Sequence, residues 1–187
     1  MRRFFLAMGL AAAGLVQAAS GLTLEQLFET LAKQRPERAA FQERKYLALL
    51  DRPVDSSGTL AFTPPARLEK RTLLPRPETL VADGDTVVLE RGGRRQALSL
   101  AGNPAIAALI ESIRATLAGD IAAIRRTYAA ELAGNADGWR ITLRPLDAAV
   151  APLVSRIEIA GVGGEVRQVE VFQADGDRSV MTITKTP

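Results

Sequence analysis

Three serines, Ser56, Ser57 and Ser179, are the candidate nucleophiles of this sequence. A serine becomes reactive when a neighbouring base removes its proton, and that base is usually a histidine or, in some enzymes, a lysine. The sequence contains no histidine and no cysteine, and no lysine follows a serine at the Ser-x-x-Lys spacing. We therefore expect a protein that is not an enzyme.

Acidic residues offer no better case for metal chemistry. Asp83, Asp85, Asp175 and Asp177 fall in two separate turn-like segments, whereas a calcium site needs a denser set of oxygen ligands. Zinc sites need the histidine or cysteine that the chain lacks. We expect no metal and no cofactor, and without cysteine the chain can form neither a disulfide nor a lipid-anchored N-terminus.

The N-terminus has the pattern of a secretory signal peptide. Arg2 and Arg3 precede a mostly apolar run from Phe4 to Val16, and small or aliphatic residues at Val16 and Ala18 predict cleavage after Ala18. The apolar run is shorter than the roughly 20 residues that span a bilayer, although an uncleaved anchor is the alternative. We expect residues 1–18 to be removed and residues 19–187 to form one exported domain.

The charge of the mature chain gives little support for nucleic-acid binding. Loss of Arg2 and Arg3 takes the net charge from +3 to +1, and the remaining basic residues alternate with acidic ones. A nucleic-acid-binding domain usually concentrates its basic residues on one face. At 47% hydrophobic residues, the chain can instead bury a sizeable core, and we expect a monomer.

Periodicity in the first half predicts a helix followed by strands. Thr23 and Gln26 form a capping box before a helix that carries Leu24, Leu27, Phe28 and Leu31 and ends before Pro36. Residues 39–50 read as a strand and 51–58 as the loop of a wide hairpin. Alternating strands follow at 58–63, around Leu68 and through 72–100, with turns at Asp-Gly and Gly-Gly.

Helical spacing returns in the middle of the chain. A helix beginning at Asn103-Pro104 carries the apolar stripe Ile106, Leu109, Ile110, Ile113 and Leu117. Asp120 can cap a second helix bearing Ile121, Ile124, Tyr128 and Leu132, ended by residues 134–139 (GNADGW). Four alternating strands complete the chain, so the fold class is α+β, with a large antiparallel sheet of nine or ten strands.

Three helices are too few to cover both faces of such a sheet, and a sheet of this size tends to curl. We therefore expect an open barrel with a helical lid. Its candidate cavity wall consists of the alternating apolar residues Phe41, Leu60, Phe62, Val87, Leu89, Ile141, Leu143, Ile157, Ile159, Val169, Val171 and Ile183. Any one of these could instead pack in an ordinary core.

Several short motifs in this order resemble the LolA family of periplasmic lipoprotein carriers. They are the first-strand pattern FQERK at 41–45, GTLAF at 58–62 followed by Pro65, LVADGDT at 80–86, and the closing segments VRQVE at 166–170 and DRS at 177–179. The resemblance covers nearly the whole mature length, and the shared order carries it, together with the export signal.

The resemblance implies a half-open barrel whose apolar interior receives the acyl chains of a lipoprotein from an inner-membrane transporter. It also implies delivery to an outer-membrane acceptor. Two positions depart from the family pattern, since Pro64 stands where carriers have arginine and Lys70 where a tryptophan is expected. These departures favour a divergent branch that carries another acylated or polyene lipid.

Two further assignments have alternatives. The stripe Ile106, Leu109, Ile110, Ile113 and Leu117 is either a lid hinged at Gly102 and Gly119 or plain core. Lys70, Arg71 and Arg76 are either a solvated edge that opposes strand-to-strand aggregation or a rim that meets anionic headgroups. For the function, the alternative to a carrier is a lipid-sensing or adaptor module of a membrane export system.

Overall fold

The computed structural model describes residues 21–34 and 38–186, and the predicted signal peptide lies outside them. The helices are α1 (Leu24–Ala32), α2 (Pro104–Ala118) and α3 (Ile121–Thr127), with a 3-10 turn at Leu100–Gly102. The strands are β1 (Arg38–Tyr46), β2 (Val54–Thr63), β3 (Arg67–Leu74), β4 (Glu78–Asp83), β5 (Thr86–Arg91), β6 (Arg94–Ser99), β7 (Tyr128–Asn135), β8 (Gly138–Pro145), β9 (Val154–Val162), β10 (Glu165–Gln173) and β11 (Arg178–Lys185).

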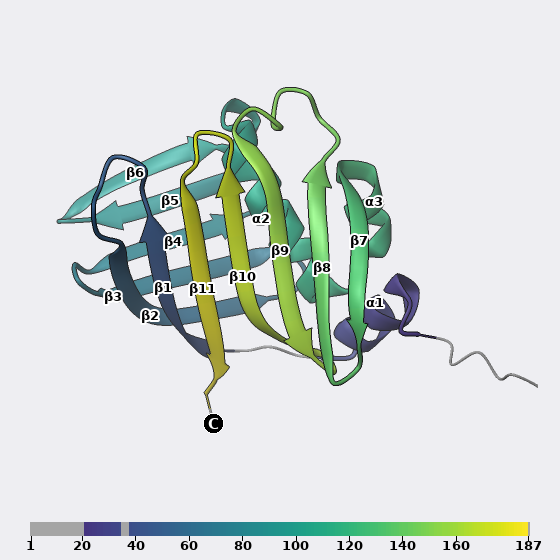
Figure 1. The fold of residues 1–187 in the computed structure, drawn as a ribbon. Helices are drawn as coiled ribbons and strands as arrows, with labels where there is room; N and C mark the ends of the chain where they lie inside the picture. The colour runs from purple at the N-terminus through teal and green to yellow at the C-terminus, as the bar shows by residue number, and fades with distance from the viewer. Residues whose placement is uncertain (1–20, 35–37, 187) are drawn as a thin grey trace, which may run out of the picture.

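All the strands belong to one antiparallel sheet, in the order β6-β5-β4-β3-β2-β1-β11-β10-β9-β8-β7. The first strand pairs with the last, with Phe41 opposite Ile183. The part formed by β2–β6 turns across behind the part formed by β7–β11, and α2 lies between the two (Figure 1). The edge strands β6 and β7 do not pair within the described residues, so the barrel is half open, and the predicted α+β class is confirmed.

The predicted second helix extends too far. Helix α3 ends at Thr127, and Tyr128 begins strand β7, which pairs with β8. Ile124, Tyr128 and Leu132 are four residues apart, a spacing that fits one face of a helix and, being even, also one face of a strand. The sheet therefore has eleven strands rather than nine or ten.

The predicted first loop, residues 51–58, is placed too far along the chain, and the predicted strand 39–50 ends earlier, at Tyr46. Residues 54–58 belong to β2, although their composition (VDSSG) is typical of turns. They pair with the charged end of β1, where Asp55 accepts a hydrogen bond of 2.7 Å from Arg44 Nε. Cross-strand pairing of polar side chains thus overrides local turn preference, and the connection covers residues 47–53 instead of 51–58.

The helix ends follow the capping residues in the sequence. Thr23 Oγ1 accepts a hydrogen bond of 3.2 Å from Gln26 N, and Gln26 Oε1 accepts one of 3.0 Å from Thr23 N, which is the predicted capping box. Asp120 Oδ1 accepts a hydrogen bond of 2.8 Å from Ala123 N at the start of α3. Helix α2 ends at Ala118 and is capped by Gly119, whose φ of 70° is left-handed.

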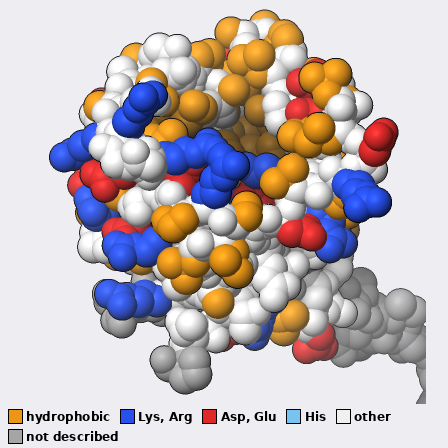
Figure 2. Space-filling view, turned by 90° about the vertical axis from the view of Figure 1, so that its left-hand side faces the viewer, with side chains coloured by type: hydrophobic (Ala, Val, Ile, Leu, Met, Phe, Trp, Pro, Cys, Tyr) orange, Lys and Arg blue, Asp and Glu red, His pale blue; other side chains and the backbone are white. Residues whose placement is uncertain are grey.

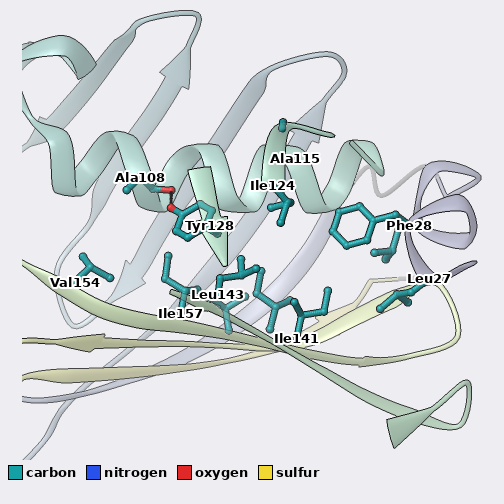
Figure 3. Packing of buried hydrophobic residues seen from close by; sticks show 14 of the residues in the cluster. Leu27, Phe28, Ala108, Ala115, Ile124, Tyr128, Ile141, Leu143, Val154 and Ile157 are labelled. Atoms are coloured by element: carbon teal, nitrogen blue, oxygen red, sulfur yellow. Dashed lines mark hydrogen bonds between the residues drawn. The ribbon is translucent and has the colours of Figure 1, made fainter. Parts of the chain in front are cut away.

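The filled core lies where the helices meet strands β7–β10. Phe28 of α1, Ile124 of α3 and Tyr128 point toward the sheet residues Ile141 and Leu143 (Figure 3). The Tyr128 hydroxyl donates a hydrogen bond to the Ala108 carbonyl of α2, and burial raises the pKa of this hydroxyl. Helix α2 is therefore held on its core side by both packing and a buried hydrogen bond.

Gly119 joins two helices at a point where no side chain fits. A Cβ atom here would lie 2.5 Å from Ala32 Cβ and 2.6 Å from the Phe28 carbonyl oxygen of α1. We predict that Gly119→Ala lowers the free energy of unfolding by about 2–4 kcal/mol, because it adds left-handed strain to a steric clash. Denaturant unfolding measures this, with Gly102→Ala as the control, since a Cβ at Gly102 meets nothing within 4 Å. Equal losses for both variants would contradict the close approach of α1 and α2.

Candidate functional site

The concave side of the sheet is not filled along its whole length. Between α2 and strands β1–β5 and β9–β11 lies a cavity of about 660 Å³, within the usual range for small-molecule sites. Most of its lining is aliphatic. On the open side of the molecule, a recess with hydrophobic side chains is bordered by a band of Lys and Arg side chains (Figure 2). The interior can therefore be reached from solvent.

The structure divides the twelve predicted wall residues between this cavity and the filled core. Those that line the cavity are Leu60, Phe62, Val87, Leu89, Ile159, Val169, Val171 and Ile183. Ile141, Leu143 and Ile157 lie instead in the core beneath α1 and α3, with exposed fractions of 0%. Phe41 is on the concave face but buried, beneath the ammonium group of Lys70. The alternation along each strand predicts which face of the sheet a residue lies on. The positions of the helices determine which part of that face is covered.

Helix α2 forms the remaining side of the cavity. All five residues of its predicted stripe line the space: Ile106, Leu109, Ile110, Ile113 and Leu117. The opposite side of the same helix carries Ala108 and Ala115, which pack in the core. Ile106 and Ile110 also contact Ala82 and Val87, so the helix rests on β4 and β5 at its N-terminal end. One helix thus separates core from cavity.

The cavity wall contains an ion pair that the sequence reasoning missed. Glu43, 7% exposed, accepts a hydrogen bond of 2.5 Å from Lys70 Nζ and one of 3.3 Å from Ser56 Oγ. Lys45 Nζ lies 3.8 Å from the same carboxylate oxygen. Burial lowers the pKa of Lys70, against the opposing attraction of Glu43. The sequence did contain one signal for this site: Phe41, Glu43 and Lys45 are two residues apart along a strand, so they lie on the same face of the sheet.

The three basic residues predicted as a rim do not lie together. Lys70 is on the concave face and lines the cavity. Arg71, the next residue, is exposed on the outer face of β3 and donates a hydrogen bond to Glu69. Arg76 is exposed in the connection between β3 and β4. Of the three, the geometry links only Lys70 to the interior.

The structure places two of the candidate nucleophiles at the cavity wall. Ser56 Oγ donates to Glu43 and Ser179 lines the cavity, but no histidine exists to complete a triad. Among residues 21–34 and 38–186, no group of three metal-ligating side chains is found. Within the same ranges, no helix has both the length and the apolar character needed to cross a membrane.

A curled, unclosed antiparallel sheet with a helix lying over an apolar cavity defines the class of half-open β-barrels. The sequence model of the outer membrane lipoprotein carrier protein LolA-like family matches residues 16–184. The chain belongs to this LolA-like family. No curated protein matches the sequence.

Several solved structures overlap with the fold at low sequence identity. The LolA superfamily protein NE2245 from Nitrosomonas europaea has 9% identity and a TM-score of 0.44, over 87% of this chain and 92% of that one. LprF from Mycobacterium bovis has 11% identity and a TM-score of 0.37, over 88% of this chain and 93% of that one. Pseudomonas aeruginosa MucB, in its complex with MucA, has 13% identity and a TM-score of 0.39, over 87% of this chain and 56% of that one. The family assignment rests on the family match.

Truncation of a leucine should separate filled core from cavity wall. We predict that Leu143→Ala lowers the free energy of unfolding by about 3–4 kcal/mol, because it opens an enclosed void among packed neighbours. Leu89→Ala should cost about 1 kcal/mol, because Leu89 already borders open space. Urea unfolding of both variants measures the difference. Similar losses would mean that the interior at Leu89 is packed as tightly as the core.

Proposed function

We propose that the protein is a periplasmic carrier that holds the acyl chains of a lipoprotein or another lipid in the cavity under α2. The observation that carries the proposal is the cavity itself, about 660 Å³ of mostly aliphatic space that opens to solvent. Membership of the LolA-like family supports the same assignment. An inner-membrane transporter would be the donor and an outer-membrane component the acceptor, and no chemical step is needed.

The hydrophobic effect explains why such a carrier needs a cavity. Each buried methylene contributes about 0.8 kcal/mol, so a 16-carbon acyl chain in water is disfavoured by on the order of 12 kcal/mol. Leu60, Leu89 and Val171 offer the aliphatic contacts that replace the membrane interior. Cargo transfer then requires only that donor, carrier and acceptor bind the acyl chain with successively greater affinity.

Helix α2 is the proposed lid. Arg114, on this helix, is 8% exposed, and its Nε and Nη2 atoms find no hydrogen-bond partner among the described residues. Buried guanidinium nitrogens without a hydrogen-bond partner destabilise the position that buries them. Displacement of α2 would hydrate Arg114, which lowers the energy needed to open the cavity. Gly102 and Gly119 flank the helix, and a glycine backbone can adopt the dihedral angles that a change in helix position requires.

Insertion of a charge into the wall tests the carrier. We predict that Leu60→Glu abolishes binding of a fluorescent fatty-acyl probe, because it places a charged side chain, directly opposite Lys70, where the acyl chain would lie. Thr59→Glu, exposed on the same strand, should leave binding unchanged. Mass spectrometry of protein purified gently from the periplasm should show a stoichiometric acylated molecule in the wild type. Full probe binding by a folded Leu60→Glu variant would contradict the proposal that the acyl chain lies in this cavity.

Removal of the Arg114 guanidinium tests the lid. We predict that Arg114→Met raises the free energy of unfolding by about 1–2 kcal/mol and slows probe uptake, because the closed position no longer buries two guanidinium nitrogens without hydrogen-bond partners. Arg126→Met removes the same charge from an exposed site on α3 and should change neither quantity. Stopped-flow fluorescence gives the uptake rate. Unchanged uptake in a stabilised Arg114→Met variant would count against motion of α2. Absence of bound lipid and of probe uptake in the wild type would favour the sensing or adaptor alternative.

A further inference from the structure

The ion pair between Glu43 and Lys70 stands inside a cavity that is otherwise lined mostly by aliphatic side chains. Lys70 is directly opposite Leu60 on β2 and Leu80 on β4, so apolar neighbours flank it on both sides. Its side chain is 24% exposed, and that of Glu43 is 7% exposed. Two charged groups have therefore been placed where hydrocarbon would be expected.

The backbone makes room for this contact. Lys70 lies on β3 and Glu43 on β1, so the lysine side chain crosses β2 to reach its partner. The residue of β2 that pairs with Phe41 is Gly58, which has no side chain to block the crossing. A Cβ at Gly58 would also lie 1.9 Å from the Arg71 carbonyl oxygen. The ammonium group ends 4.9 Å from the centre of the Phe41 ring.

Stability alone does not account for the pair. Two buried charges lose their hydration, and replacement of such a pair by packed hydrophobic residues is often neutral or stabilising. A cavity that held only hydrocarbon would also bind it more tightly with leucine at both positions. Ligand sites, in contrast, combine apolar walls with a few placed polar groups that fix the orientation of the ligand.

The charges on this face leave an excess of positive charge. Lys45 and Lys70 share the single carboxylate of Glu43. Glu78, on the same face of β4, already has a salt-bridge partner, because its Oε2 atom lies 3.8 Å from Arg91 Nη1. Arg178 also borders the cavity, and its guanidinium stacks over the Tyr46 ring. An anionic group entering here would meet more cations than carboxylates.

We propose that Lys70 binds the anionic headgroup, a carboxylate or a phosphate, of an acyl lipid held in the cavity. The proposal rests on the carrier function proposed above. The headgroup oxygen replaces the Glu43 carboxylate as acceptor for Lys70 Nζ, while Lys45 and Ser56 remain beside Glu43. The acyl chain then lies along the aliphatic wall from Leu60 toward Val171.

A series of 16-carbon amphiphiles tests the headgroup assignment. Hexadecanoate, hexadecyl phosphate, hexadecanol and hexadecylamine would each compete with a neutral fluorescent fatty-acyl probe, below their micelle concentrations. We expect the two anions to bind about tenfold more tightly than hexadecanol, and hexadecylamine to bind no more tightly than hexadecanol. The tighter of the two anions distinguishes a carboxylate headgroup from a phosphate.

Variants assign the preference to Lys70. Lys70→Met should remove the tenfold preference while hexadecanol affinity stays within about twofold. The double variant Glu43→Gln/Lys70→Met, which leaves no unpaired buried carboxylate, should give the same result if the single variant folds poorly. Glu43→Gln should increase the preference, since a competing anion is gone. Arg71→Met, on the outer face of the same strand, is the matched control and should keep it.

The outcomes separate the two proposals. Equal binding of all four amphiphiles by the wild type would overturn the headgroup assignment and leave the carrier intact. An equal loss of preference in Arg71→Met and Lys70→Met would also overturn it, because surface charge would then explain the effect. Failure of every amphiphile to bind would overturn the carrier function itself.

Discussion

The pairing of β1 with β11 is the contact on which the site depends. Without it, the strands would form two separate meanders, β1–β6 and β7–β11. The cavity takes its wall from both meanders. Leu60 and Leu89 come from β1–β6, and Val169 and Ile183 come from β7–β11. Eight cross-strand pairs, from Ala39 opposite Lys185 to Tyr46 opposite Arg178, therefore bring the two walls into one curved surface.

The division between core and cavity follows from where bulky side chains are placed. The closed end holds Phe28, Tyr128 and Trp139, all at most 2% exposed, and α1 and α3 cover it. Aromatic rings fill space efficiently, and the Trp139 indole is fixed by a 2.8 Å hydrogen bond to the Gly163 carbonyl. Around the cavity the side chains are mostly aliphatic, and α2 is the helix that covers most of them, with Leu31 of α1 at the margin. The same sheet is therefore packed at one end and hollow at the other.

The sequence was informative about strands and about their faces, because side-chain alternation with a period of two is local. It predicted the helix caps at Thr23 and Asp120 and the α2 stripe for the same reason. It could not distinguish a helix from a strand at Tyr128 and Leu132, since residues four apart satisfy both periods. Nor could it show that Leu143 is covered and Leu89 is not, because that depends on helices distant in the chain. Glu43 was missed because its partner Lys70 is reached only across β2.

The sheet order also has a kinetic consequence. Residues 38–46 and 178–185 are at opposite ends of the described chain, so their pairing closes a very long loop and has high contact order. A chain that emerges from its N-terminus can form the β1–β6 meander early, but the inner edge of β1 stays unpaired until the last strand is available. The complete binding surface can therefore form only once residues 178–185 are available to pair. A chain without its last strand exposes the unpaired edge of β1, which is prone to aggregation, and its cavity lacks part of the wall that would contact a ligand.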